Sequence, residues 1–223
     1  MQTTRRLIIA IDGPSGAGKG TVARAVAIAL DYRHVDTGGM YRAVAWKALL
    51  DGVDLTHEEA VAAIARSAAF ELSHGKIGID GHDVTSAIRT SEMDAAAALV
   101  ARLPKVRAAL VERQRAFGAD GGVVMEGRDI GTVVFPAADV KLYLDASPEE
   151  RARRRSQDPS HAASREKSGV AVVAEALAAR DQSDRTRTVS PLAKADDALY
   201  VDTTGLTIED VVARALQAVR DRS

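Results

Sequence analysis

The chain has 223 residues, of which 46% are hydrophobic and 27% are charged, and its formal net charge is −1 at pH 7. This length and apolar content suffice for one α/β domain with a full core and one or two excursions. The near balance of charge argues against a general electrostatic attraction to nucleic acid or to a membrane surface. The sequence has no cysteine, which excludes disulfides, thiolate metal sites and thiol nucleophiles.

Strands and helices are predicted to alternate along the chain. Strand signals lie at 7–12, 33–36, 122–126, 140–145 and 199–202. Apolar residues at three- and four-residue spacing predict helices at 21–30, 39–50, 104–117, 148–156, 170–181 and 207–220. This alternation is typical of a parallel sheet with helices on both faces. Ligands of such sheets bind beyond the carboxyl ends of the strands, so residues that follow a strand are site candidates.

The first apolar run, residues 7–11, is too short to cross a bilayer. It leads directly into a glycine-rich loop, so we interpret it as the first strand rather than as part of a signal peptide. We therefore expect a cytoplasmic protein. We also expect a monomer with no membrane and no nucleic-acid partner.

The glycine-rich loop predicts a nucleoside-triphosphate site. Gly13, Gly18 and Lys19 match the phosphate-binding pattern G-x-x-x-x-G-K. Such loops point backbone N–H groups at phosphate oxygens, and the lysine reaches the β- and γ-phosphates. Gly20 stands where Ser or Thr is expected, and the hydroxyl comes one residue later, at Thr21. That ending favours small-molecule kinases over GTPases.

Donor binding is assigned to the loop and the start of the helix after it. The expected contacts are Gly13, Ser15, Gly16, Ala17, Gly18, Lys19, Gly20 and Thr21. The hydroxyl of Thr21, or that of Ser15, is placed to hold Mg²⁺ or a phosphate oxygen. Glu126, at the end of the strand at 122–126, is placed to hold Mg²⁺ through water. Mg²⁺ together with a nucleoside triphosphate is thus the expected cofactor system.

Charged residues also follow two other strands. Thr37 and the amides after it begin a helix and can receive an anion, which Arg42 can grip from one turn further along. Arg128 is placed to bind a phosphate, and Asp129 to accept a hydrogen bond from an exocyclic amine or a hydroxyl. A capped helix and a solvated turn with a salt bridge are the structural alternatives.

Two segments interrupt the alternation of strands and helices. Residues 70–84 alternate apolar and polar side chains between turn residues, which predicts a small antiparallel meander inserted after the second core strand. Residues 157–168 are polar, rich in helix breakers, and interpreted as a mobile loop that acts as a lid. The segment before them carries Arg151, Arg153, Arg154 and Arg155.

A densely charged segment follows the predicted lid. Arg180, Asp184 and Arg187 are spaced by four and three residues, so a helix would place them on one face. Two arginines and one carboxylate suit a phosphate and a sugar diol, although a solvated helix face is the alternative. Asp145 also follows a strand, but the residues after it predict a helix cap rather than a site.

These motifs resemble those of the bacterial cytidylate kinases, a branch of the nucleoside monophosphate kinases. The resemblance covers essentially the whole chain and rests on residues 11–21, 36–42, 126–136 and 180–187, with Pro191 and Leu192. The Gly-Arg-Asp-Ile-Gly-Thr-Val-Val run and the inserted meander point to this branch in particular.

The resemblance implies a three-layer α/β fold of the P-loop kinase type. Its parts would be a parallel five-stranded core, a small antiparallel β subdomain inserted in it, and a short lid. Within one kinase unit, the core would comprise residues 1–36, 104–150 and 190–223. The monophosphate-binding part would comprise residues 37–103, and the lid residues 151–170.

The resemblance also implies transfer of the γ-phosphoryl group of ATP to CMP or dCMP, with Mg²⁺. The acceptor site would comprise Thr37, Tyr41, Arg42, Arg107, Arg128, Asp129, Arg180, Asp184 and Arg187. Arg107 and Asp129 would meet the cytosine, whose 4-amino group is a donor that uracil lacks. Arg154 would contact ATP. The family often has a serine near position 98 that contacts the base, where this chain has Ala98.

The expected reaction is a direct in-line transfer without a covalent enzyme intermediate. Catalysis would rest on alignment and charge neutralisation by Mg²⁺ and by Lys19, Arg128 and Arg187. One alternative is a P-loop kinase for another small anionic acceptor such as UMP. The other is a non-enzymatic nucleotide switch, although the sequence has no Asn-Lys-x-Asp run for guanine.

Overall fold

The computed structural model describes residues 6–73, 75–158 and 169–222. Among these residues, five parallel strands form one sheet in the order β2-β6-β1-β7-β8. The strands are β1 (Ile8–Asp12), β2 (Arg33–Asp36), β6 (Val123–Gly127), β7 (Val140–Asp145) and β8 (Leu199–Asp202). The α/β fold with a parallel five-stranded sheet is therefore confirmed, and all five strands lie within one residue of their predicted positions.

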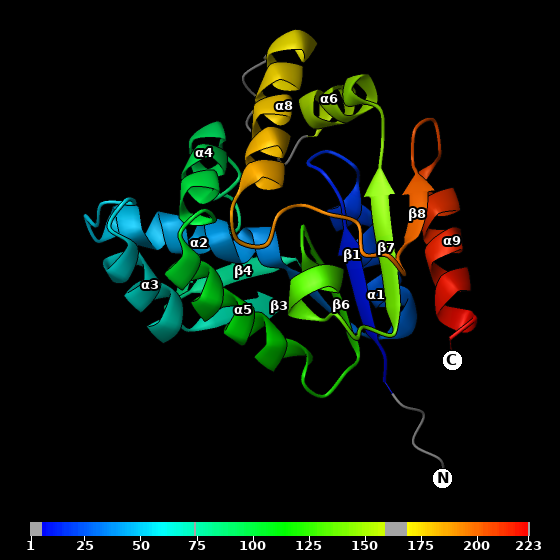
Figure 1. The fold of residues 1–223 in the computed structure, drawn as a ribbon, viewed down its shortest axis with the longest axis horizontal. Helices are drawn as coiled ribbons and strands as arrows, with labels where there is room; N and C mark the ends of the chain where they lie inside the picture. Colours follow the sequence, from blue (N-terminus) through cyan, green and yellow to red (C-terminus); the bar gives the residue numbers. More distant parts are fainter. Residues whose placement is uncertain (1–5, 74, 159–168, 223) are drawn as a thin grey trace.

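Helices cover both faces of the sheet (Figure 1). On one face, α1 (Lys19–Leu30) and α9 (Ile208–Arg220) pack on apolar side chains of β1, β7 and β8. On the other face lie α2 (Thr37–Leu50), α3 (Glu58–Ser67), α4 (Ser91–Val100) and α5 (Pro104–Gly118). Because both faces are covered, the central strands are apolar along almost their whole length.

The predicted meander is present as a second, antiparallel sheet. It consists of β3 (Phe70–Ser73), β4 (Lys76–Ile79) and β5 (His82–Asp83), in that order. Its apolar side shares a hydrophobic cluster with the main sheet, since Ile77 and Ile79 belong to the same buried group as Ala10 and Met125. The small sheet therefore packs directly on the main core.

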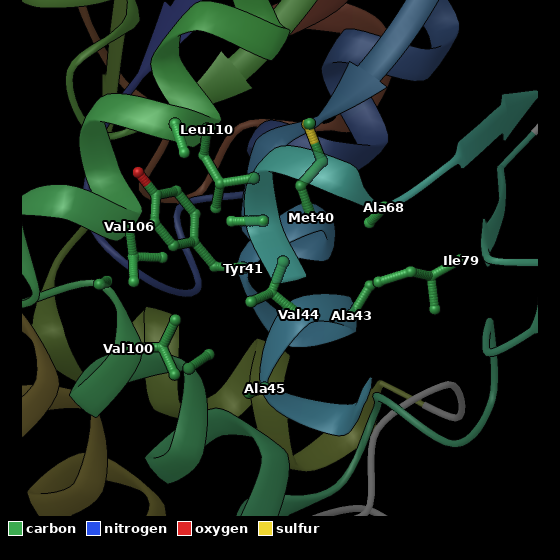
Figure 2. Close-up of a cluster of buried hydrophobic side chains, with 14 of the residues drawn as sticks. Met40, Tyr41, Ala43, Val44, Ala45, Ala68, Ile79, Val100, Val106 and Leu110 are labelled. Carbon is green, nitrogen blue, oxygen red and sulfur yellow. The ribbon is translucent and has the colours of Figure 1, made fainter. Parts of the chain in front are cut away.

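Helix α2 lies at the centre of this shared cluster. Figure 2 shows Tyr41 of α2 beside Val106 and Leu110 of α5, and Ile79 of β4 on the side of Ala43. Nine of the fourteen α2 residues are buried, because the helix has neighbours on several sides. The boundaries predicted for the core, the monophosphate-binding part and the lid stay a prediction.

The helices above the carboxyl edge of the sheet are α6 (Pro148–Gln157) and α8 (Val170–Thr186) (Figure 1). They pack on each other through a small cluster of described residues, formed by Ala152, Val173 and Leu177. The predicted helix at 170–181 continues to Thr186, which includes most of the charged segment. Residues 159–168 of the predicted lid loop lie outside the described residues.

Several short elements were missing from the sequence prediction. Helices α3 and α4 are capped by His57 and Thr90, whose side chains accept hydrogen bonds from the helix amides, and the short patterns of these helices were not recognised. The π-helical turn η1 (Ile130–Val134) follows β6 and was not predicted either. Asp145 has the structural role expected of it, since it accepts from the Ala146 amide while Ser147 caps α6.

Candidate active site

A cleft of about 940 Å³ lies at the carboxyl edge of the parallel sheet. It is lined by the glycine-rich loop, the start of α2, the end of β6, and helices α4, α6 and α8. Every residue predicted for the donor, acceptor and metal sites lines this cleft, with the exception of Gly13. Gly13 lies beneath the loop, where its φ of +145° and the Leu144 carbonyl oxygen, 1.9 Å from the position of a Cβ, require glycine.

Lys19 begins α1 and points back into the loop. Its side chain is 7% exposed, and Nζ donates to the Pro14 carbonyl oxygen at 2.6 Å. Burial and the nearby Arg128 guanidinium hold the pKa of Lys19 well below its usual value, while Glu126 and Asp181 oppose that shift. A triphosphate bound in the loop would place negative charge beside this ammonium group and so favour its charged form.

A buried ion pair between α6 and α8, which the sequence did not reveal, holds the phosphate loop in place. Arg151 of α6 donates to the carbonyl oxygens of Ser15 (3.0 Å) and Ala146 (3.2 Å) and pairs with Asp181 of α8. Asp181 in turn accepts from the Ser15 amide at 3.1 Å. Arg151, one of the predicted lid arginines, therefore supports the loop and does not line the cleft.

The other arginines of α6 differ in their surroundings. Arg154 donates to Oγ1 and the carbonyl oxygen of Thr203 at 2.9 and 2.7 Å and pairs with Glu150 at 2.8 Å. Arg155 donates to Ser15 Oγ at 2.9 Å, and its burial lowers its pKa to about 10. Both line the cleft on the side of the phosphate loop.

Glu126 explains why Gly20 departs from the usual loop pattern. A Cβ at Gly20 would lie 3.0 Å from Glu126 Oε1, which is also 3.0 Å from His34 Nε2. The Thr37 hydroxyl donates to the Glu126 carbonyl oxygen at 2.7 Å. A side chain at position 20 would therefore press on the Glu126 carboxylate.

The oxygen groups here fit Mg²⁺, which binds one or two carboxylates together with substrate phosphates. Glu126 and the Thr21 hydroxyl line the cleft beside the phosphate loop. Within the described residues, no group of three or more His, Asp or Glu side chains forms a complete metal site. A magnesium ion would therefore depend on the bound nucleotide for most of its ligands.

We expect Gly20→Ser to lower kcat by about tenfold or more and to raise the Mg²⁺ concentration needed for half-maximal rate, because the new side chain would displace the Glu126 carboxylate. Steady-state rates over a magnesium titration measure both effects. Ala63→Ser is the matched control, since Ala63 is exposed on α3 and does not line the cleft. An unchanged magnesium dependence would contradict the prediction.

The side of the cleft predicted to bind the acceptor is a network of arginines and aspartates. Arg128 Nε donates to Asp184 Oδ2 at 2.8 Å, and Arg187 lies 3.5 Å from Asp184 and 3.6 Å from Asp129. Arg107, which is 2% exposed, pairs with Asp129. Burial opposes the ionisation of Asp184, but the surrounding arginines hold its pKa below its usual range.

A second part of this network connects α2, α4 and α8. Asp36 caps α2 through the Gly39 amide (2.8 Å) and pairs with Arg42 (3.2 Å) and Arg89 (3.0 Å). Asp94 of α4 lies 2.6 Å from Arg180 of α8 and 3.6 Å from Arg42. Arg89 and Asp94 carried no sequence signal, because their partners are distant in the chain.

Three buried polar atoms around Asp129 lack a hydrogen-bond partner within the described part of the chain. They are the Tyr41 hydroxyl, Arg107 Nε and Arg187 Nη2. Burial raises the pKa of Tyr41 to about 12, and the Arg107 guanidinium lies 5.4 Å from the centre of its ring. Buried polar atoms are normally paired, so a polar ligand is the natural partner for this group.

No helix among the described residues is long and apolar enough to cross a membrane. The fold and the cleft together define a small-molecule kinase of the P-loop class, because a phosphate loop faces an arginine-rich second site. A shikimate kinase from Acinetobacter baumannii, solved in complex with shikimate, has a similar fold. Its TM-score is 0.50 at 16% identity, over 97% of this chain and 94% of that one.

Sequence comparison identifies the family. The family model described as Cytidylate kinase matches residues 9–221. The cytidylate kinase of Desulfitobacterium hafniense is 48% identical over 221 residues, covering 98% of this chain and 94% of that protein. That of Bacillus subtilis is 46% identical over 227 residues, covering 98% and 99%. The chain belongs to the cytidylate kinase family.

Proposed function

We propose that the phosphoryl transfer expected of a cytidylate kinase, from ATP to CMP or dCMP, takes place in this cleft by direct in-line displacement. The observation that carries the proposal is that the phosphate loop with Lys19 and the arginine network around Arg128 line the same cleft. A triphosphate on the loop and a monophosphate on the arginines would then face each other, as a one-step transfer requires.

The charge of the acceptor network supports a monophosphate acceptor. Among the described residues, six arginines pair with four aspartates, which leaves a net charge of +2. A phosphate monoester carries close to two negative charges at neutral pH. The arginines are Arg42, Arg89, Arg107, Arg128, Arg180 and Arg187, and the aspartates are Asp36, Asp94, Asp129 and Asp184.

Three cationic side chains are assigned to the transferring group. Lys19 would contact the β- and γ-phosphates, while Arg128 and Arg187 would hold the acceptor phosphate and neutralise charge as it develops. Glu126 and Thr21 would hold Mg²⁺, which would supply further charge neutralisation when bound. The acceptor phosphate is itself an anion, so the reaction needs no strong general base.

The remaining acceptor contacts are assigned by chemical type. Thr37 and Arg42 of α2 are assigned to the acceptor phosphate, and Arg180 and Asp184 of α8 suit the ribose hydroxyls. Tyr41, whose ring lies beneath the Arg107 guanidinium, is assigned to the acceptor nucleotide beside the base contacts. Arg107 and Asp129 are assigned to the cytosine, since a carboxylate accepts from the 4-amino group and uracil has a carbonyl there. Ala98 lines the same cleft and offers no side-chain hydrogen bond to the base.

A coupled assay of ADP release with CMP, dCMP, UMP, AMP and GMP tests the function. We expect CMP and dCMP to be the best acceptors. We further expect Asp129→Asn to lower kcat/KM for CMP by about 10- to 100-fold and to affect UMP far less, because an NH₂ donor replaces one of the two carboxylate oxygens that can accept from the 4-amino group and the negative charge is lost. Equal rates with all acceptors would contradict the assignment, and tight GDP binding without turnover would favour a nucleotide switch.

Two further predictions made from the sequence, on a lid and on the oligomeric state, remain proposals. Residues 151–170 are proposed to close over the bound nucleotides, because α6 and the beginning of α8 stand above the cleft. The protein is proposed to be a monomer, which sedimentation in solution would establish. Neither proposal is needed for the assignment of the donor and acceptor sides.

A further inference from the structure

Asp12, the last residue of β1, is a buried carboxylate outside the roles assigned so far. It is 5% exposed, and it lies in register beside Gly127 of β6 and Tyr143 of β7. Burial raises its pKa to about 6, which shows that this environment disfavours the charge. A carboxylate in the middle of the sheet therefore needs specific partners that compensate for its burial.

The partners of Asp12 are two backbone amides that follow β6. Oδ1 accepts from the Ile130 amide at 2.9 Å, and Oδ2 accepts from the Gly131 amide at 2.7 Å. Hydrogen bonds from N–H groups to a carboxylate are stronger than those between neutral groups. Because the two Asp12 oxygens bind consecutive amides, they fix the orientation of two successive peptide planes.

Those two peptides determine where Asp129 points. Asp129 is the residue immediately before Ile130, and its carbonyl oxygen accepts from the Val133 and Val134 amides at 2.8 and 3.1 Å. The backbone of Asp129 is thus hydrogen-bonded to η1, while the Asp129 side chain pairs with Arg107 and Arg187. A rotation of the 129–131 backbone would move this carboxylate relative to both arginines.

We propose that Asp12 is a positioning residue for base recognition, which holds the backbone of residues 129–131 so that the Asp129 carboxylate faces the acceptor base. The inference rests on the proposed role of Asp129 as the group that recognises cytosine. Because Asp12 also directly precedes Gly13, it ties the recognition of the acceptor base to the strand that carries the phosphate loop.

The competing explanation is that Asp12 acts in binding the phosphoryl donor, because its carboxylate also interacts electrostatically with Lys19. Lys19 Nζ, however, donates to the Pro14 carbonyl oxygen, whereas both oxygens of Asp12 are directed at the amides of η1. The two explanations predict changes in different kinetic constants. A donor-side role would change KM for ATP, and the proposed role would change KM for CMP.

The test is Asp12→Asn, assayed with CMP and UMP at saturating ATP. The amide keeps the shape of the carboxylate but leaves one backbone N–H facing an NH₂ group. We expect kcat/KM for CMP to fall by about 10- to 100-fold, mainly through KM, with UMP affected far less and KM for ATP changed by less than about twofold. Equal losses for CMP and UMP, or a change confined to KM for ATP, would overturn the proposal.

A double-mutant cycle with Asp129→Asn separates this inference from the function it rests on. If Asp129→Asn alone leaves the preference for CMP over UMP intact, the assignment of Asp129 fails, whatever Asp12 does. If Asp129→Asn lowers the preference and Asp12→Asn does not, only the role of Asp12 fails. The proposal requires that Asp12→Asn has no further effect on the preference once Asp129 is replaced.

Two other variants guard against a general loss of structure. Asp139→Asn is the matched control, because Asp139 accepts from the Ile8 amide (2.8 Å) at the opposite end of β1, and it should leave the preference for CMP unchanged. If Asp12→Asn does not fold, Gly131→Ala is the alternative variant, because it alters the same backbone segment at residues 129–131. The added Cβ would lie 3.4 Å from Asp12 Oδ2 and 3.2 Å from Lys141 Cδ. It should lower the preference in the same direction, and an unchanged preference would overturn the proposal.

Discussion

Replacing Lys19 by alanine is expected to lower kcat by about three orders of magnitude or more while the fold stays intact. Lys19 is the cation proposed to contact the β- and γ-phosphates, and removing one well-placed donor in a buried site typically costs 10²- to 10³-fold. The protein should lose no stability, because burial already disfavours the charge and is the largest cause of the lowered pKa of Lys19. Single-turnover rates of ADP formation and thermal melting measure the two effects.

Lys47→Ala is the matched control for this variant. Lys47 lies on α2 and pairs with Asp51 on the surface, away from the cleft. Its replacement should leave the rate within about twofold, since exposed ion pairs contribute little. A near-normal rate for Lys19→Ala would contradict the role assigned to this lysine.

The second large effect is expected for Arg128→Lys, which keeps the charge but removes the planar guanidinium. Burial opposes the charge of Arg128, but the nearby carboxylates, with Asp184 the foremost, together raise the pKa of the guanidinium above its usual value. The fork of the guanidinium can bond Asp184 and a phosphate at once, which a lysine ammonium cannot do with the same geometry. We expect kcat/KM for CMP to fall by about 10²-fold or more.

Steady-state kinetics with each substrate varied in turn will show where that loss lies. The fall should appear in kcat and in KM for CMP, with KM for ATP nearly unchanged. Arg115→Lys serves as the control, because Arg115 bonds the carbonyl oxygens of Val133 and Val134 and does not line the cleft. If Arg128→Lys and Arg115→Lys lower the rate to the same extent, Arg128 has no special role at the acceptor phosphate.

The position of the site was predictable because it follows from the topology of parallel sheets. Strand periodicity and the residue after each strand were enough to bring Lys19, Arg42 and Arg128 to one edge, since the carboxyl ends of parallel strands meet there. The helical spacing of Arg180 and Asp184 also holds, and α8 places both on the cleft. Arg187 lies just past the helix end but still reaches Asp184.

The partners of these residues were not predictable, because they depend on contacts between distant segments. Asp94 lies 86 residues from Arg180, and Asp12 lies more than 100 residues from the amides that it binds. A carboxylate next to a strand end looks the same in sequence whether it faces solvent, a ligand or a backbone amide. The close approach of Glu126 to Gly20 was not predictable from the sequence either, since the two residues meet only in the folded chain.

The uneven distribution of apolar contacts has a consequence for how the protein unfolds. The acceptor half around α2 shares one large cluster with the sheet, so these parts lose structure together. Helices α6 and α8, by contrast, hold each other through the small cluster of Ala152, Val173 and Leu177. Among the described residues few buried apolar contacts hold these two helices, so we expect local opening to start there. Mild heating would release Arg180 and Asp184 from the cleft, and inactivate the enzyme, before the sheet itself melts.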